Sequence, residues 1–258
     1  MNIQWRNQVV LLTGATGGIG QAIAKALDEK GAHIILTGRS KAKLEQLQQN
    51  LTLHHTAIVA DITSDEGRDR VVSACQRLPL SILVNNAGTT KFVDHADLEG
   101  LSSDDFQNIY GVNVIGAYQM TRAVAEQMKQ QEEGGSIVNV ASIAGVAGVG
   151  SCIAYAASKG AMITMTLSLA RVLGPKVRVN VVCPGFIEGE WLKEGLGEER
   201  YEQARQVSIK NAPLGVTATS DTVAESILYF IQGPTVVTGE SLIIDGGRHL
   251  GMTPLTRR

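Results

Sequence analysis

Seven short apolar segments alternate with helix-like segments along the 258-residue chain, and this alternation restricts the possible folds strongly. The intervening stretches carry apolar residues at helical spacing. Strands that alternate with helices form parallel sheets, because a parallel strand pair needs a crossover connection. The sequence therefore predicts an α/β fold with a doubly wound parallel sheet of about seven strands and helices on both faces. The expected strands span residues 8–13, 32–37, 55–60, 80–85, 135–142, 177–183 and 240–245.

The length and composition predict one domain over residues 1–258. Residues 186–212 follow the end of the sixth expected strand and combine many charges with Trp191, Leu192 and Leu196. Segments in this position often cover a binding site, so we expect a substrate loop or lid there, although an ordinary pair of surface helices would have the same pattern.

Charge and cysteine content restrict the partners and the compartment. The formal net charge of −2 gives no attraction for nucleic acid or an anionic membrane, which favours a small-molecule substrate. The three cysteines are odd in number and lie in expected helices or strands, which argues against a disulfide framework. No leader of charged and then apolar residues follows Met1, and no apolar run reaches about 18 residues. These features predict a cytoplasmic protein.

A glycine-rich turn joins the first expected strand to the first helix. Gly14, Gly18 and Gly20 lie in this turn. Glycines let the backbone approach a pyrophosphate closely, and a helix amino terminus offers free N–H groups to an anion. A glycine-rich turn alone is a weak signal, but its position between a strand and a helix favours a Rossmann-like dinucleotide site.

The end of the second strand bears on the choice of cofactor. No acidic residue stands between Thr37 and Ser40, where a carboxylate would bind the ribose hydroxyls of NAD. Arg39 suits the 2′-phosphate of NADP instead, although a solvated loop arginine is the simpler alternative. The sequence favours NADP, with NAD as a possible cofactor.

A Ser, a Tyr and a Lys are placed to converge after the fifth strand. Ser142 lies where the chain leaves that strand, and Tyr155 and Lys159 are one helical turn apart. An ammonium near a phenol stabilises the phenolate and lowers its pKa, so Tyr155 could act as a general acid or base. Ser142 could hydrogen-bond the substrate oxygen. The alternative is an aromatic residue at a helix start and a solvated lysine, since this spacing is common by chance.

Other polar residues lie at strand ends or among apolar residues. Asp61 could accept a hydrogen bond from an adenine amino group or cap the helix that starts near Ser64. The side chains of Asn85 and Asn86 could tie neighbouring strands together. Asn113 lies in a long helical segment, residues 101–131, where an asparagine is usually a tolerated polar residue. Its neighbours are apolar, however, so its amide needs hydrogen-bond partners, and a structural or relay role is the other interpretation.

Together these motifs resemble the short-chain dehydrogenase/reductase family over nearly the whole chain. The resemblance implies a catalytic tetrad of Asn113, Ser142, Tyr155 and Lys159. In this tetrad Tyr155 exchanges the proton, Lys159 also holds the nicotinamide ribose, and Asn113 supports a water-linked proton path. It also implies a homotetramer or homodimer and no metal. The implied cofactor contacts are Gly14, Thr16, Gly18, Ile19, Gly20, Arg39, Ser40, Asp61, Ile62, Asn86, Ala87, Gly88, Tyr155, Lys159, Pro184, Gly185 and Ile187.

The chain departs from the family pattern at two positions. Gly17 stands where many relatives have a basic residue, so recognition of a 2′-phosphate depends mainly on Arg39. Gly189 stands where relatives often have a threonine that contacts the carboxamide, which leaves that contact to the backbone of Ile187.

The resemblance implies an oxidoreductase that transfers a hydride between nicotinamide and a carbonyl or secondary alcohol, and Arg39 predicts a preference for NADP. One alternative is a 3-oxoacyl-[acyl-carrier-protein] reductase, although the acidic pair Glu132 and Glu133 lies near where such enzymes offer basic residues to an acidic carrier. The other is a dinucleotide-sensing protein without turnover, against which the intact Ser, Tyr and Lys argue.

Overall fold

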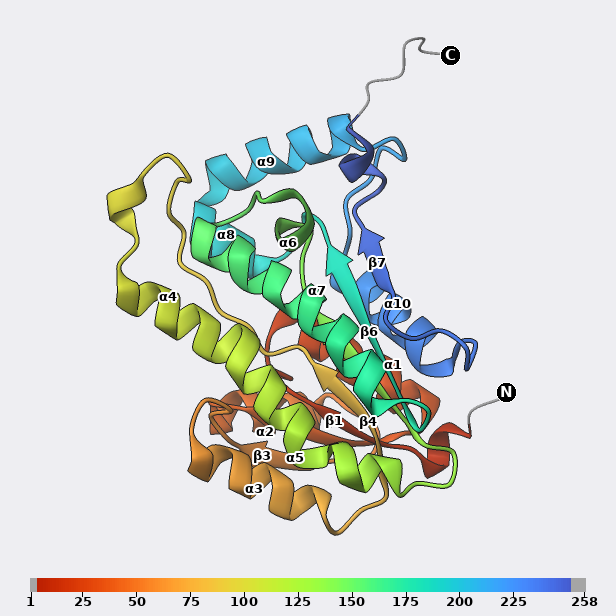
Figure 1. The fold of residues 1–258 in the computed structure, drawn as a ribbon. Helices are drawn as coiled ribbons and strands as arrows, with labels where there is room; N and C mark the ends of the chain where they lie inside the picture. The colour runs from red at the N-terminus through yellow and green to blue at the C-terminus, as the bar shows by residue number, and fades with distance from the viewer. Residues whose placement is uncertain (1–3, 252–258) are drawn as a thin grey trace.

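The computed structural model describes residues 4–251 and contains one seven-stranded sheet in the order β3-β2-β1-β4-β5-β6-β7 (Figure 1). All six neighbouring pairs are parallel, which confirms the predicted fold class. Residues 1–3 and 252–258 of the expected domain lie outside the described residues. The strands are β1 (Val9–Leu12), β2 (His33–Gly38), β3 (Thr56–Val59), β4 (Leu80–Asn85), β5 (Gly135–Val140), β6 (Val177–Pro184) and β7 (Ser241–Ile244).

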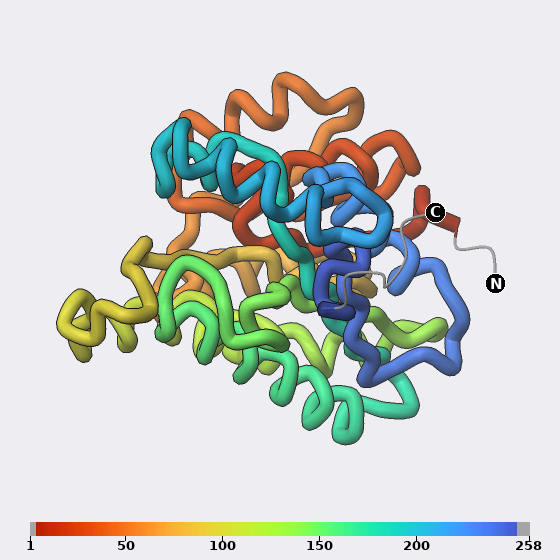
Figure 2. The backbone as a smooth tube through the Cα atoms, turned by 90° about the horizontal axis from the view of Figure 1, so that it is seen from above, coloured from red at the N-terminus to blue at the C-terminus, as the bar shows by residue number. Residues whose placement is uncertain are grey.

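Helices cover both faces of the sheet, as predicted. Helices α1, α2 and α10 pack on one face, while α3, α5 and α7 pack on the other, and Figure 2 separates these layers when the molecule is seen from above. The helices are α1 (Gly18–Lys30), α2 (Lys41–Gln49), α3 (Asp65–Cys75), α4 (Ser103–Tyr110), α5 (Ala117–Lys129), α6 (Ala144–Ala147), α7 (Ile153–Leu173), α8 (Glu190–Leu196), α9 (Glu198–Asn211) and α10 (Ser220–Gln232). Across residues 4–251, every helix is too short or too polar to span a membrane.

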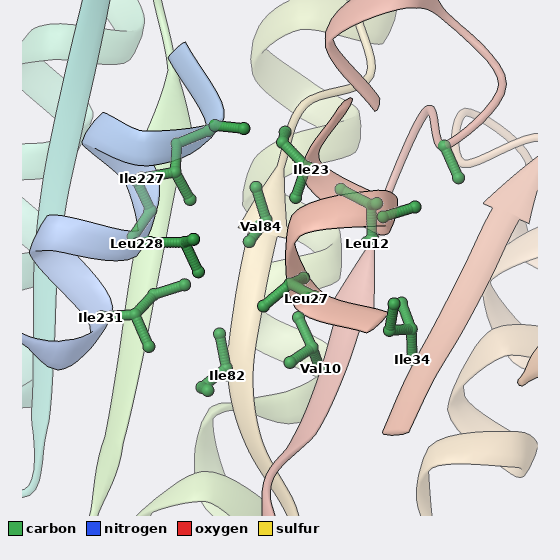
Figure 3. Packing of buried hydrophobic residues seen from close by; sticks show 14 of the residues in the cluster. Val10, Leu12, Ile23, Leu27, Ile34, Ile82, Val84, Ile227, Leu228 and Ile231 are labelled. Atoms are coloured by element: carbon green, nitrogen blue, oxygen red, sulfur yellow. The ribbon is translucent and has the colours of Figure 1, made fainter. Parts of the chain in front are cut away.

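Apolar side chains of α1 and α10 pack against β1 and β4 near the middle of the sheet (Figure 3). Leu12, Leu27, Val84 and Ile227 are fully buried there. Burying such a side chain contributes about 1.5–3 kcal/mol relative to leaving it exposed. This packing fixes α1 against the sheet, and with it the glycine turn at the start of the helix.

The strand order reverses between β1 and β4. From β1 the chain builds outward to β2 and β3, and it then returns to place β4 on the other side of β1. In open α/β sheets, ligands bind in the crevice at the carboxyl ends of strands where the order reverses. The loops after β1 and β4 therefore mark the expected binding crevice.

The predicted single helical segment 101–131 is interrupted. A π-helical turn, Gly111–Gly116, separates α4 from α5 and contains Asn113. A Cβ at Gly116 would lie 2.9 Å from Ile62 Cδ1, so glycine permits close packing against the segment after β3. Such π turns insert an extra residue into the helix and frequently occur at functional sites.

A buried chain of polar side chains joins β4, β5, α5 and α7. Asn85 Nδ2 donates to Asn139 Oδ1 at 2.9 Å and to Thr121 Oγ1 at 3.1 Å. Asn139 Nδ2 donates to Thr166 Oγ1 at 2.8 Å. This network confirms for Asn85 the prediction that asparagine ties neighbouring strands.

We predict that Asn139→Ala lowers the free energy of unfolding by about 2–4 kcal/mol, because it removes two hydrogen bonds and leaves buried partners unsatisfied. Urea unfolding followed by circular dichroism measures the change. Asn50→Ala, at an exposed helix end, is the matched control and should change stability by less than about 0.5 kcal/mol. A similar loss for both variants would show that the network does not stabilise the fold.

Candidate active site

The glycine turn after β1 is closely packed against the segment after β4. Gly14 has φ +64, and a Cβ there would lie 2.7 Å from Ala87 Cα. A Cβ at Gly20 would lie 2.2 Å from the Gly14 carbonyl oxygen. Helix α1 begins at Gly18 without a side-chain cap, so its first N–H groups are available to an anion. This cradle fits a dinucleotide pyrophosphate.

Asn86 locks the two crevice loops together. Its Nδ2 donates to the carbonyl oxygens of Thr13 at 3.1 Å and Gly14 at 2.9 Å. Thr13 Oγ1 in turn accepts from the backbone N–H groups of Asn86 and Ala87. The predicted tie between strands is thus confirmed for Asn86 too, and Thr13 is a functional neighbour that the sequence analysis did not single out.

The segment after β2 presents Arg39 at the surface. Arg39 is exposed. Hydrogen bonds from Thr63 are the main cause of the lowered pKa of Asp61, and the charge of Arg39 contributes to it. Ser40 Oγ accepts from Lys43 N at 3.3 Å and so caps α2. A Cβ at Gly38 would lie 3.3 Å from Thr16, which places Thr16 of the glycine turn beside this segment. Arg39, Thr16 and Asp61 therefore border the same end of the crevice.

Asp61 does not cap α3. Ser64 is the cap, since its Oγ accepts from Gly67 N at 3.0 Å, and Asp61 Oδ1 instead accepts from the backbone and side chain of Thr63. The buried Ile62 packs between this turn and Gly116. Of the two roles considered for Asp61, the helix cap is wrong, and the contact with adenine stays a prediction.

Ser142, Tyr155 and Lys159 meet beyond the carboxyl end of β5. Lys159 Nζ lies 5.6 Å from the centre of the Tyr155 ring and donates to the Val140 carbonyl oxygen at 2.8 Å. Ser142 Oγ accepts from Ala144 N at 3.1 Å. A Cβ at Gly88 would lie 3.5 Å from Lys159 Nζ, so the segment after β4 passes beside the ammonium.

The expected fall in the pKa of the phenol does not occur in this structure. Burial raises the pKa of Tyr155 to about 12, and the neighbouring Ser142 side chain offsets only part of the rise. The Lys159 ammonium is itself buried, which lowers its pKa to about 8. Burial disfavours both charged forms, and it outweighs the attraction that the helical spacing predicted. The phenol is therefore protonated at neutral pH.

Asn113 is completely buried, and its amide is held by three hydrogen bonds. Its Oδ1 accepts from Thr89 N at 2.8 Å, while its Nδ2 donates to Thr89 O at 3.0 Å and Ser158 Oγ at 2.9 Å. Ser158 Oγ donates to the Tyr155 carbonyl oxygen at 2.7 Å. The amide thus joins the π turn, the segment after β4 and α7. No motif in the sequence marks Thr89 or Ser158 as its partners.

The end of β6 forms another side of the crevice. The Pro184 carbonyl oxygen accepts from Ile143 N at 2.8 Å, which holds the segment around Ser142. A Cβ at Gly185 would lie 2.6 Å from Asp245 Cβ, so only glycine fits between β6 and the turn after β7. Ile187 forms an isolated bridge with Ala218. The structure thus brings the implied residues of β6 to the same edge as the Ser, Tyr and Lys.

One of the three cysteines borders the site, since Cys152 caps α7 and its Sγ accepts from Tyr155 N at 3.4 Å. All three cysteines are free and buried, as the sequence predicts. Within residues 4–251, no group of three or more His, Cys, Asp or Glu side chains is arranged to hold a metal ion.

Comparisons with known proteins identify the family. The family model described as short chain dehydrogenase matches residues 8–199. A relative assigned as ketoacyl reductase 2 of the granaticin polyketide synthase from Streptomyces violaceoruber is 36% identical over 247 residues, covering 94% of this chain and 96% of that protein. The 3-oxoacyl-[acyl-carrier-protein] reductase of Thermotoga maritima is 33% identical, and the match covers 93% of this chain and 97% of that protein. The chain belongs to the short-chain dehydrogenase family of oxidoreductases.

Two solved structures share the fold over nearly their whole length. The 3-ketoacyl-(acyl-carrier-protein) reductase of Brucella melitensis, complexed with NADH, has a TM-score of 0.83 at 31% identity and covers 93% of this chain and 98% of its own. An NAD⁺-bound xylitol dehydrogenase has a TM-score of 0.86 at 30% identity and covers 95% and 100%. Both proteins carry a nicotinamide cofactor.

We predict that burial of the Lys159 ammonium makes stability depend on pH. Because its pKa falls from 10.5 to about 8 on folding, the unfolded chain binds more protons between these values, and the folded protein gains stability as pH rises through this window. Relative to Lys159→Met, the unmodified protein should gain on the order of 2–3 kcal/mol between pH 8 and 10.5. Unfolding in urea across this range measures the difference.

Lys25→Met is the matched control, since Lys25 is exposed on α1. This variant and the unmodified protein should keep a constant difference in stability across the same pH range. A constant difference for Lys159→Met as well would contradict the lowered pKa of Lys159.

Proposed function

We propose that this protein is an NADP-preferring oxidoreductase that transfers a hydride between nicotinamide and a carbonyl or secondary alcohol. The observation that carries the proposal is the convergence of Ser142, Tyr155 and Lys159 beside the glycine turn, at the edge where such sheets bind dinucleotides. The nicotinamide, when bound, supplies or accepts the hydride.

The residues of this chain would hold the cofactor and manage the proton. The free N–H groups at the start of α1 would bind the pyrophosphate, with Gly14, Gly18 and Gly20 allowing its close approach. Lys159 would bind the nicotinamide ribose with N–H groups that remain after its bond to Val140. Asp61 and Ile62 would border the adenine, while Asn86, Ala87, Gly88 and Ile187 would line the crevice.

Tyr155 would give its proton to the carbonyl oxygen during reduction. A phenol whose pKa is about 12 is fully protonated at neutral pH, which suits a proton donor. Ser142 would hydrogen-bond the same oxygen as negative charge develops on it. The Lys159 ammonium nearby would then favour the phenolate that remains. Asn113 would act through Thr89 and Ser158, by keeping these groups in place.

We predict that Tyr155→Phe lowers turnover about a hundredfold or more, since general acid–base catalysis contributes roughly 10² to 10⁴. Loss of NADPH absorbance with a panel of ketones measures turnover, and titration calorimetry should give a cofactor dissociation constant within a few-fold of the original. Tyr229→Phe, on the exposed face of α10, is the control. Turnover that survives in Tyr155→Phe would remove the phenol from the mechanism. Tight cofactor binding without any turnover of the unmodified protein would favour the sensing alternative.

The preference for NADP is supported by Arg39. Its exposed guanidinium lies at the border of the crevice, and a guanidinium can form two charge-assisted hydrogen bonds with a phosphate. The NADH and NAD⁺ in the two solved relatives make NAD the competing choice.

We predict that kcat/KM is about ten- to a hundredfold higher with NADPH than with NADH, because Arg39 binds the additional phosphate in a solvent-screened setting. Arg39→Ala should remove most of this difference and leave kcat/KM for NADH within about twofold. Arg77→Ala tests for a general effect of charge. Equal or better use of NADH by the unmodified protein would assign Arg39 to the surface only. Gly38→Asp is a less direct test, since a Cβ there would press on Thr16.

A narrower candidate is reduction of a 3-oxoacyl thioester on an acyl carrier protein. The named activities of the relatives favour it. At the far end of α5, however, Glu132 and Glu133 are exposed, and the carbonyl of Glu132 accepts from Lys176 Nζ at 3.4 Å. The test compares kcat/KM for an acetoacetyl group on acyl carrier protein with kcat/KM for the same group on pantetheine. A strong preference for the carrier protein would favour the narrower candidate, and similar values would favour a general carbonyl reductase.

The lid and the assembly belong to the same proposal. Helices α8 and α9 lie over the carboxyl edge of the sheet, where a lid would exclude water from the site (Figure 1). Tyr118 on α5 and Leu167 and Val172 on α7 are exposed apolar residues, which supports a homotetramer that pairs these helices.

A further inference from the structure

Helix α8 of the lid rests against one aromatic ring from another part of the chain. The rings of Phe92 and Trp191 lie 5.7 Å apart between centres, at a tilt of 56°. A Cβ at Gly195 would lie 2.0, 2.2 and 2.6 Å from three ring atoms of Phe92. The ring therefore lies directly on the backbone of α8, where even a methyl group would have to displace it. In Figure 1 the segment after β4 passes beside α8.

The backbone that carries Phe92 is fixed to the proposed catalytic centre. Asn113 holds both the N–H and the carbonyl of Thr89. Thr90 Oγ1 and Ser151 Oγ are 2.6 Å apart, and Val93 N donates to Ser151 O at 2.9 Å. Bonds on both sides thus hold the Phe92 position, and they tie it to the π turn and the start of α7.

The rest of the lid has anchors of its own. Arg248 donates to Ser208 of α9 at 3.0 Å. Arg205 of α9 pairs with Glu188 at 3.1 Å, and Glu188 also accepts from Thr217, which lies outside the lid. Gly197, with φ +78, joins α9 to α8. The ion pairs of Lys193 remain within the lid, with Glu190 and Glu198. The contact with Phe92 links α8 to the segment that Asn113 holds.

We propose that Phe92 is a positioning residue that seats α8 over the site, and that Gly195 is required because only glycine lets the helix reach the ring. The expected effect on turnover rests on the proposed function, whereas the contact between Phe92 and α8 does not. Phe92 acts through α8, and a helix displaced from the ring would leave the site less well closed to water.

The fluorescence of Trp191 reports directly on the contact between Phe92 and α8, which we call the seat of α8. The chain has two tryptophans, so Trp5→Phe leaves Trp191 as the only one. In this background, Phe92→Ala should raise acrylamide quenching of Trp191 about 1.5-fold or more, because the half-exposed indole loses its aromatic neighbour and the lid loosens. Phe92→Tyr keeps the ring and should retain the original quenching. Phe106→Ala, an exposed aromatic on α4, is the matched control and should leave it unchanged.

Gly195→Ala tests the close approach independently. The added methyl group collides with the ring, so this variant should also raise the quenching of Trp191. In the double variant with Phe92→Ala the ring is gone and the methyl group has room, so its quenching should match that of Phe92→Ala alone within about 20%. Thermal unfolding of each variant checks that the fold is intact.

Kinetics then relate the seat to the reaction. Phe92→Ala and Gly195→Ala should each raise KM for the carbonyl about fivefold or more while the cofactor dissociation constant stays within about twofold. Unchanged quenching in Phe92→Ala, or effects of the two substitutions that add in the double variant, would overturn the proposal. Quenching that responds as expected in a protein that reduces no carbonyl would support the seat and contradict the proposed function.

Discussion

The arrangement of the site depends on the hydrogen bonds of the Asn113 side-chain amide. Its three hydrogen bonds hold the segment after β4 on one side and α7 on the other, and those two elements carry Gly88 and the Tyr155–Lys159 pair. A fully buried amide needs hydrogen-bond partners for its donors and its acceptor. The partners therefore fix the position of the amide, and the amide fixes the position of its partners. The π turn is the local distortion of the α4–α5 segment that carries this side chain.

Burial shapes the chemistry of the site more than proximity does. Lys159 is a buried cation whose Nζ bonds to the Val140 carbonyl, and its pKa is lowered, while the pKa of Tyr155 is raised. Both shifts favour neutral groups, because a charged group loses hydration when it is enclosed. At neutral pH the phenol is protonated, and it lies beside the Lys159 ammonium. The hydrogen bond between Asn85 and Asn139 ties β4 to β5 one residue before Val140.

Hydrogen bonds of Asn113 also hold the segment against which α8 packs. Phe92 lies on a segment that is tied to Asn113 through Thr89, and its ring contacts the backbone of α8 at Gly195. On the other side of α8, Gly197 has φ +78 and joins this helix to α9. Arg39 lies at the opposite end of the crevice, where solvent weakens any contact with a phosphate.

The sequence by itself determined the sheet, its strands and the edge at which the site forms. Apolar strands alternating with helices leave few topologies open, and Gly14 and Gly20 occupy positions where a Cβ would collide. Only the tertiary structure decided how the 101–131 segment breaks and in which direction the pKa of Tyr155 shifts. Both outcomes depend on contacts between residues far apart in the chain, such as Asn113 with Thr89, and on burial by several elements at once. Spacing along one helix placed Tyr155 near Lys159, but it carried no information about the water that the surrounding elements exclude.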